Sequence, residues 1–316
     1  MIRIAVTADD YGLSPGVSKA IIALANAGRL SGTACMTVFP WWPEQAYGIA
    51  PLLDQIDVGV HLTLTDHAPL DTMPVLAPSG RMPSPVHLYR RAVIGAIDPA
   101  EIKSELNRQI DAFEDALGRP PAFLDSHHHA HQFPQIRDVV ISVFLTRLSA
   151  QRAYMRCCWD SPARIFKRGV HPWLSLGIAL SGRALAKRAA QCGVPLNRGF
   201  SGVHKFSTAT NYGALFNKFL RHQVDGGMIM CHPGIVDDQL AQLDTVVETR
   251  ENEFGWLASD AMPQAMAAAN SQIFRLSEIL HERAKPADYS RSRMKNVTPH
   301  DKEVENQTGT IGQKLR

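Results

Sequence analysis

Four histidines stand within five positions in the interior of the chain, in the segment Asp-Ser-His-His-His-Ala-His that spans residues 125–131. Imidazole binds divalent cations and exchanges protons near neutral pH, so this residue type suits both metal centres and acid–base chemistry. A cluster of this kind is a poor filler for an apolar core, and its interior position excludes a purification tag. The segment therefore indicates a functional site.

Other residues with the same chemistry follow strand-like apolar runs. Asp9 and Asp10 end the first run, His61 lies inside another, and His232 ends a late one. Each alone has an ordinary structural interpretation, since paired acids often cap helices and a single histidine in a strand is often a hydrogen-bonded core residue. In a parallel α/β barrel, however, the carboxyl ends of all strands share one rim. These residues would converge there, which favours a joint function.

Oxygen and imidazole ligands without thiolate suit Mg²⁺, Zn²⁺, Mn²⁺, Co²⁺ or Ni²⁺. One carboxylate with two imidazoles leaves coordination positions open, as catalytic metal sites do. Such a cation lowers the pKa of bound water and polarises a carbonyl group. A second carboxylate can then accept the proton of the water, and a histidine can protonate a leaving amine. The residues thus predict a hydrolase with one divalent metal ion, Mg²⁺ or Zn²⁺ foremost.

The elements that position these residues alternate in type along the chain. Helix-period segments cover residues 15–27, 101–117, 136–148 and 212–222, and strand-like runs cover residues 2–8, 33–39, 58–64, 122–126, 153–157, 199–203, 228–231 and 273–276. Ser14 is the predicted N-cap of the first helix. Alternation of this kind predicts an α/β fold with a mostly parallel sheet. Because the chain is long and no G-x-G-x-x-G motif follows the first strand, a complete or incomplete (β/α) barrel is favoured over an open sheet.

Two segments interrupt the alternation, and one follows it. Residues 66–85 are rich in proline and predict a long loop over one rim, while residues 161–196 predict an insertion with a short apolar helix. Residues 286–316 are polar and lack periodic apolar positions, so we expect a disordered tail. The prediction is a single barrel domain over residues 1–285.

Composition excludes several classes of protein. Of the 316 residues, 45% are hydrophobic and 20% are charged, the balance of an ordinary globular protein. The net charge of +3 is not concentrated in any basic block, so we expect no nucleic-acid partner. Apolar runs are too short to cross a membrane. The five cysteines are odd in number and irregularly spaced, and the N-terminus carries no secretory signal, so we expect a cytoplasmic protein with reduced thiols.

Four motifs, in this order along the chain, resemble those of the YdjC-like carbohydrate deacetylases, a family that includes chitooligosaccharide deacetylase and hopanoid-associated deacetylases. They are T-A-D-D-Y-G-L-S at residues 7–14, G-V-H-L-T-L at 59–64, D-S-H-H-H-A-H at 125–131 and C-H-P-G at 231–234. The resemblance implies a (β/α) barrel of the glycoside hydrolase/deacetylase type. It also implies removal of the acetyl group from an N-acetylated sugar, such as an N-acetylglucosamine-containing oligosaccharide or glycolipid, with release of acetate.

The resemblance further implies a metal site formed by Asp10, His61 and His127. Tyr11 stands where phenylalanine is usual in the family. This change keeps an aromatic ring beside the site and should leave metal binding intact. The family also suggests a homodimer.

Catalytic roles are implied in the same way. Asp9 would be the base, His232 the acid that protonates the departing amine, and Arg156 the residue that orients Asp9. Alternate side chains of an extended segment face one side, so we expect His129 and His131 to join His127 there and to bind the substrate.

Three alternatives remain open from the residues. The first is another metal-dependent hydrolase on the same barrel, an amidohydrolase or a phosphoesterase. The second is a non-catalytic protein that binds a metal or a sugar. The third is a glycosidase with paired carboxylates, which the ligand-like histidines disfavour. The sugar itself is also open: Phe166, Trp173 and Leu174 in the insertion point to a long or lipid-linked substrate, but a simple helical lid explains them equally well.

Overall fold

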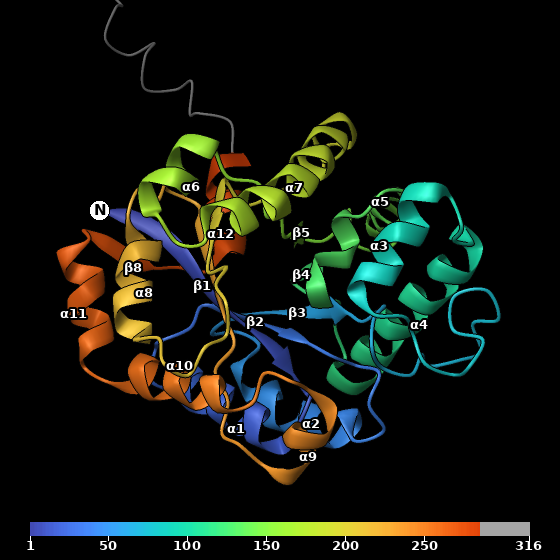
Figure 1. Cartoon of the computed structure of the whole chain (residues 1–316), viewed down its shortest axis with the longest axis horizontal. Coiled ribbons are helices and arrows are strands. Elements are labelled where there is room, and N and C mark those ends of the chain that lie inside the picture. The colour runs from blue at the N-terminus through green and yellow to red at the C-terminus, as the bar shows by residue number, and fades with distance from the viewer. Residues whose placement is uncertain (285–316) are drawn as a thin grey trace, which may run out of the picture. The chain divides into compact units, whose positions relative to one another are not determined.

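A computed structural model describes residues 1–284, and their strands form one parallel sheet in the order β5-β4-β3-β2-β1-β7-β6, with β8 also paired to β1. Figure 1 shows helices around this sheet. The strands are β1 (Ile2–Tyr11), β2 (Gly32–Cys35), β3 (Asp57–Leu62), β4 (Phe123–Ser126), β5 (Tyr154–Met155), β6 (Gly199–Ser201), β7 (Gly227–Cys231) and β8 (Ser271–Ile273). Every pairing between neighbouring strands is parallel.

Helices follow most strands, as the alternation in the sequence predicted. They are α1 (Pro15–Asn26), α2 (Trp42–Ile49), α3 (Pro85–Ile94), α4 (Pro99–Leu117), α5 (Ile136–Arg147), α6 (Pro162–Arg168), α7 (Pro172–Cys192), α8 (Tyr212–Leu220), α9 (Asp238–Leu243), α10 (Glu248–Ala258), α11 (Ala261–Ala268) and α12 (Leu276–Ala284). Two short 3-10 helices are η1 (Ala50–Leu52) and η2 (His127–Gln132). Among these described helices, none is both long enough and apolar enough to cross a bilayer.

The sheet is an incomplete barrel. Within residues 1–284 its hydrogen-bonded order ends at β5 and β6, and a single bridge from Met155 to Leu196 links β5 to the chain just before β6. The predicted α/β barrel-type fold is therefore confirmed in this half-barrel form. The predicted insertion over residues 161–196 lies between these two strands and forms α6 and α7, a longer helical segment than the sequence suggested.

Strand β1 is the centre of the fold because it pairs with β2, β7 and β8. Its residues from Ile4 to Tyr11 are all buried, which places the two acids at its end inside the molecule. The chain then enters α1 through the predicted cap, where the Ser14 side chain accepts a hydrogen bond from the Val17 amide at 3.3 Å. This cap fixes the direction in which the chain leaves the acids.

Several predicted boundaries were too long. The predicted strand over residues 33–39 ends at Cys35, and the one over residues 153–157 contains only Tyr154–Met155. In both places the chain leaves the ladder early to form the rim loops, which apolar composition does not reveal. The predicted tail, residues 286–316, lies outside the described residues.

The start of α1 is packed tightly against the loop that follows β7. A Cβ atom at Gly16 would lie 2.1 Å from the carbonyl oxygen of Ile235, and the Gly16 amide donates a hydrogen bond to Asp237. We expect Gly16→Ala to lower the free energy of unfolding by about 1–3 kcal/mol, the usual cost of overpacking. Gly255→Ala in α10 is the matched control, because its Cβ meets no atom within 4 Å and alanine favours a helix by up to about 1 kcal/mol. Urea denaturation measures both, and equal stability of Gly16→Ala and wild type would contradict this packing.

Candidate active site

The carboxyl ends of β1, β3, β4 and β7 meet at one rim, as expected for a parallel sheet. The side chains gathered there come from residues far apart in the sequence: Asp9 and Asp10 on β1, His61 on β3, His127 after β4 and His232 after β7. All five line the same cavity. The convergence that the sequence analysis expected for these residues is thus present in the structure.

A local irregularity turns both acids toward the site. The register between β1 and β2 shifts between Ala8 and Tyr11, and Asp10 has a φ of 69°, which is rare for a residue other than glycine. Adjacent side chains of a regular strand point to opposite faces, whereas an irregularity of this kind re-aims one of them. As a result, Asp9 and Asp10 both lie beside His61.

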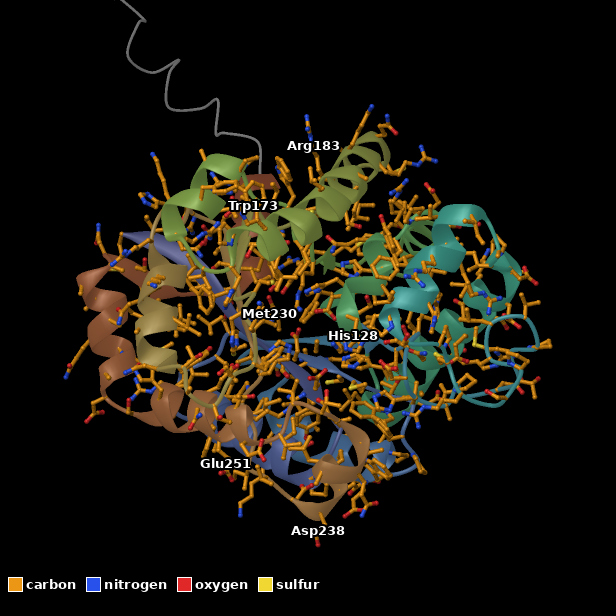
Figure 2. All side chains as sticks on the ribbon, viewed as in Figure 1. His128, Trp173, Arg183, Met230, Asp238 and Glu251 are labelled. Carbon is orange, nitrogen blue, oxygen red and sulfur yellow. The ribbon has the colours of Figure 1, made fainter. Side chains whose placement is uncertain are left out.

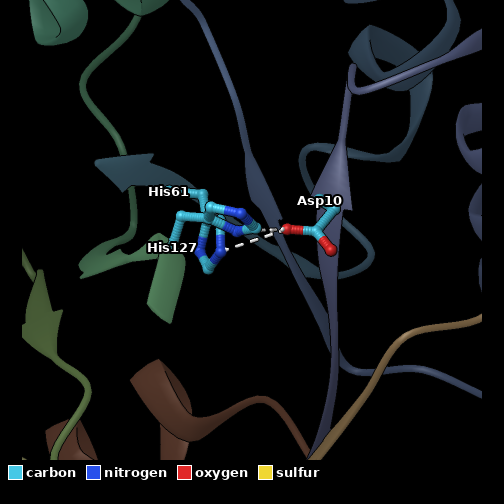
Figure 3. A group of neighbouring side chains, drawn as sticks. All are labelled: Asp10, His61 and His127. Carbon is cyan, nitrogen blue, oxygen red and sulfur yellow. Dashed lines mark hydrogen bonds and ion pairs between the residues drawn. The ribbon is translucent and has the colours of Figure 1, made fainter. Parts of the chain in front are cut away.

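Asp10, His61 and His127 form a compact group of potential metal ligands. The Oδ1 atom of Asp10 lies 3.3 Å from Nε2 of His61 and 3.1 Å from Nδ1 of His127. One ligand atom from each residue falls within 4.8 Å of the other two, and all three residues are buried. Figure 3 shows both imidazoles directed at the Asp10 carboxylate. Two imidazole nitrogens and one carboxylate oxygen at this spacing suit a transition-metal ion or Mg²⁺.

Two further groups hold this cluster in place. Nδ1 of His61 lies 2.7 Å from Oδ1 of Asp125, and its Nε2 lies 3.3 Å from Oδ1 of Asp10, so the ring is held between two carboxylates. Arg250 donates from Nη2 to the other oxygen of Asp10, Oδ2, at 2.7 Å. Burial disfavours the charged form of His61, but the carboxylates of Asp125 and Asp9 outweigh it and raise the His61 pKa to about 10. The field at this imidazole strongly favours positive charge.

Asp9 forms a separate, buried ion pair. Its two oxygens accept hydrogen bonds from Nη1 and Nη2 of Arg156 at 2.6 and 2.5 Å, and Nη2 also lies 2.8 Å from Oδ2 of Asp125. Burial raises the pKa of Asp9, but the Arg156 guanidinium outweighs this and lowers the pKa to about 2. Asp9 is therefore ionised near neutral pH and held in a fixed orientation.

His232 lies across the rim from the histidines of β3 and η2. Its Nε2 is 3.8 Å from Oδ2 of Asp9, and its ring meets Phe206 edge-on at 5.1 Å. Burial lowers the pKa of His232 although Asp10 and Asp9 act in the opposite direction. His232 thus faces the cavity beside Asp9 and is not one of the three clustered ligands.

The histidine-rich segment is not extended, and this part of the prediction was wrong. Residues His127–Gln132 form the 3-10 helix η2, in which His128 and His129 have φ values of 55° and 58°. Left-handed backbone at two successive residues sends neighbouring side chains in different directions. The alternation expected of a strand is therefore lost.

The four histidines consequently have different surroundings. His128 hydrogen-bonds through Nδ1 to Thr65 at 2.9 Å, and His129 lies against the Cys158 sulfur at 3.5 Å; both line the cavity. His131 is fully buried, with its ring nitrogens 2.8 Å from Ser126 Oγ and 2.9 Å from the Arg156 carbonyl oxygen. Direct contact with a substrate is open to His129 but not to His131, whose bonds join η2 to the chain that carries Arg156.

Arg250 is a site residue that the sequence analysis missed. It is 1% exposed, lines the cavity and bridges Asp10 to Asp244. It belongs to α10, in a stretch of mixed charges that is typical of a solvent-exposed helix. The available signal was weak, namely that Arg250 and Glu253 are three positions apart and so share one helix face.

The site opens into a large cavity with apolar walls. Its volume is about 1000 Å³. In Figure 2 the labelled His128 and Met230, which both line it, lie near the middle of the view. Besides the titratable groups described above, α3 and α7 contribute apolar side chains to its lining, namely Val86, Tyr89, Leu174, Ile178 and Leu180.

Comparison with known proteins identifies the family and relatives of this chain. The model of a family described as YdjC-like protein matches residues 3–268. A chitooligosaccharide deacetylase of Serratia marcescens is 38% identical over 136 residues, which cover 43% of this chain and only about half, 53%, of the relative. A chitooligosaccharide deacetylase of Yersinia pestis (strain Pestoides F) is 31% identical over 240 residues, which cover 74% of this chain and 83% of the relative.

One solved structure has the same fold. A crystal structure of a proposed cellobiose-phosphate cleavage protein from Enterococcus faecalis V583 superposes with a TM-score of 0.67 and 18% sequence identity. The match covers 88% of this chain and 99% of that one. At this identity, the likeness concerns the fold alone.

The contact between Asp125 and His61 leads to a prediction about metal affinity. We expect Asp125→Asn to weaken binding of a divalent cation about 10–100-fold, the usual effect of losing a carboxylate behind a histidine ligand. Arg156 keeps Asp9 as a partner, so the fold should persist. Isothermal titration of the metal-free protein with Zn²⁺ measures the change, and the exposed carboxylate variant Asp115→Asn is the control. Unchanged affinity in Asp125→Asn would remove the supporting role of this carboxylate.

Proposed function

The chain belongs to the YdjC-like protein family, and from this premise we propose that it is a metal-dependent deacetylase that hydrolyses the N-acetyl group of an amino sugar. The observation that carries the proposal is the position of the Asp10, His61 and His127 cluster beside the ionised Asp9 in one cavity. The curated relatives bear the name chitooligosaccharide deacetylase. Their chemistry, amide hydrolysis on a sugar, is the kind that these groups can perform.

A divalent cation fits the residues that we assign to it. Asp10 Oδ1, His61 Nε2 and His127 Nδ1 would hold it, and the remaining coordination positions would be open to water and to the acetyl oxygen. With its Nδ1 bonded to Asp125, His61 would present the lone pair of Nε2 to the cation when the ring is neutral. When bound, the cation would polarise the acetyl carbonyl and bring the pKa of a water to about 7.

We assign the base to Asp9. Its low pKa keeps it ionised, and the double contact with Arg156 holds both oxygens in place beside the cluster. A carboxylate with so low a pKa is a weak base. It can accept a proton readily only from a water whose own pKa has been lowered, as a bound cation would do. Asp9 accepts the proton of the water as the oxygen adds to the acetyl carbon.

We assign the acid to His232. An amine is a poor leaving group unless it is protonated while the C–N bond breaks, so a proton donor must lie near the base but outside the ligand set. His232 meets this requirement, with Nε2 3.8 Å from Asp9 and its ring on the cavity wall. The products of the reaction are acetate and the free amino sugar, and no covalent enzyme intermediate is needed.

The walls of the cavity favour a substrate whose sugar carries a hydrocarbon group. Val86 on α3 is 58% exposed and Leu180 on α7 is 53% exposed, yet both line the cavity. Large apolar side chains at the mouth of a site are stabilised when an apolar group covers them. Aliphatic side chains such as Ile178 offer no hydrogen bonds to a polar oligosaccharide. We therefore propose a glycolipid bearing N-acetylglucosamine as the natural substrate class.

The two adjacent acids have different proposed roles, which can be separated. We expect Asp9→Asn to retain its metal and to lose about 10²–10⁴-fold in turnover, the usual effect of removing a general base. Asp10→Asn should instead lose most of its affinity for the metal, because it removes the negative charge of the carboxylate that both imidazoles face. Metal analysis together with acetate release measures both variants. If Asp9→Asn loses the metal and Asp10→Asn keeps it, the two roles are exchanged.

The substrate class is tested with three acetylated sugars: octyl N-acetylglucosaminide, methyl N-acetylglucosaminide and diacetylchitobiose. Each methylene buried against the cavity wall contributes about 0.8 kcal/mol, or about fourfold in affinity. We therefore expect the octyl glycoside to have the highest kcat/KM. Leu180→Gln should reduce this preference and leave the rate on the methyl glycoside unchanged, since Leu180 lies at the mouth.

The outcomes separate the parts of the proposal. Equal kcat/KM for the two glycosides, with faster reaction of diacetylchitobiose, would replace the glycolipid by a polar oligosaccharide. Metal binding without acetate release from any acetylated sugar would refute the deacetylase itself and favour a binding protein.

A further inference from the structure

The loop that carries His232 rests on the first turns of α10. The amide of Gly234 donates to the carbonyl oxygen of Arg250 at 3.1 Å, and the amide of Val236 donates to the side chain of Glu251 at 3.1 Å. A Cβ atom at Gly234 would lie 3.1 Å from Cβ of Arg250, which is closer than most real contacts of a Cβ atom. The backbone of the loop at Gly234 is thus packed directly against α10. The position of the loop is therefore set by α10.

Glu253 on α10 is a buried carboxylate that the mechanism above does not use. It is 1% exposed and does not line the cavity. Its Oε2 accepts the backbone amide of His232 at 2.7 Å, and its Oε1 lies 2.9 Å from Nε2 of His204. Burying a carboxylate costs several kcal/mol unless it is paired and hydrogen-bonded, so these two contacts account for its presence in the interior.

His204 connects Glu253 to the ring of His232 by a second route. Its two ring nitrogens lie 2.9 Å from Oε1 of Glu253 and 3.2 Å from the carbonyl oxygen of Lys205. The His204 ring packs on Phe206 at 4.6 Å, and Phe206 meets the His232 ring edge-on at 5.1 Å. Glu253 thus contacts the backbone of His232 directly and its side chain through two intervening rings.

We propose that Glu253 is a positioning residue for His232, which it holds in the orientation that delivers a proton to the leaving amine. The inference rests on the proposed function, because it assigns a purpose to the orientation of His232. Nδ1 of His232 is buried and has no hydrogen-bond partner within the described residues, so the ring is not held through that atom. Its orientation depends instead on the backbone contact, on Phe206 and on Asp9 at 3.8 Å, and the first two of these contacts lead to Glu253.

Leaving-group dependence distinguishes positioning from a merely structural role. Loss of an acid slows hydrolysis of an amide strongly and of an activated aryl acetate weakly, because a phenolate leaves without a proton. We expect Glu253→Ala to lower kcat on the N-acetyl sugar at least about tenfold, within the 10²–10⁴-fold that proton transfer typically contributes. The loss on the aryl acetate should be smaller and the metal content unchanged. In a His232→Ala background, Glu253→Ala should cause little further loss, since the proton transfer that Glu253 supports is already absent.

Two further variants test whether the effect of Glu253→Ala comes only from misfolding or from any change in α10. Glu253→Gln keeps an oxygen acceptor for the His232 amide and nearly the same volume, so it should fold even where Glu253→Ala does not. We expect it to show the same preference for the aryl acetate with a smaller loss. Glu248→Ala, on the exposed side of the first turn of α10, should behave as wild type. An equal loss on amide and ester, or fully multiplicative losses in the double variant, would overturn the proposal.

A spectroscopic readout separates this inference from the proposed function. Nitrogen-15 NMR of the imidazole of His232 reports its tautomer and order without any turnover. Wild type should give one sharp pair of ring signals, and Glu253→Gln should shift or broaden them. If wild type deacetylates no sugar but the His232 signals still depend on Glu253, the function is wrong and the positioning stands. Unchanged signals in the glutamine variant would overturn the positioning, whatever the activity.

Discussion

The site depends on the burial of two adjacent carboxylates at the end of the central strand. Burying two like charges side by side in an apolar interior costs free energy of folding. Each carboxylate is therefore paired with an arginine, Asp9 with Arg156 and Asp10 with Arg250. Asp125 adds a third buried carboxylate beside Arg156, and Asp244 adds a fourth beside Arg250. Among the described residues, these four carboxylates face two guanidiniums, so the negative charge exceeds the positive charge of the arginines next to His61 and His127. A protonated imidazole or the proposed divalent cation would offset this excess.

This constraint also accounts for three of the backbone irregularities. Asp10 has a left-handed conformation and so do two successive residues of η2, His128 and His129. Such conformations cost about 1–3 kcal/mol each and persist only where the surroundings enforce them. Here they bring Asp9 and Asp10 to one side of β1 and separate the directions of neighbouring histidines. The strained backbone at Asp10, His128 and His129 thus raises the free energy of the folded state, and in return five polar side chains lie together at one rim.

Much of the fold could be predicted because its signals are local. Alternating patterns located most strands and helices, and the cap at Ser14 placed the start of α1. The residues at strand ends converged because parallel strands end at one rim. Arg250 and Glu253 could not be found in this way, since a charged stretch on a helix is typical of an exposed surface and only tertiary packing buries it. The conformation of residues 127–131 was missed for a related reason: nothing in a run of four histidines and one alanine signals left-handed backbone.

The gap in the sheet between β5 and β6 has an evolutionary consequence. Residues 161–196 occupy this gap as α6 and α7, and no ladder hydrogen bond between named strands passes through them. Asp9, Asp10, His61, His127 and His232 lie on or directly after β1, β3, β4 and β7 instead. Selection can therefore change the length or composition of α7, and with it one wall of the cavity, without breaking a pairing between named strands. This wall and the polar cluster are encoded in separate stretches of the gene.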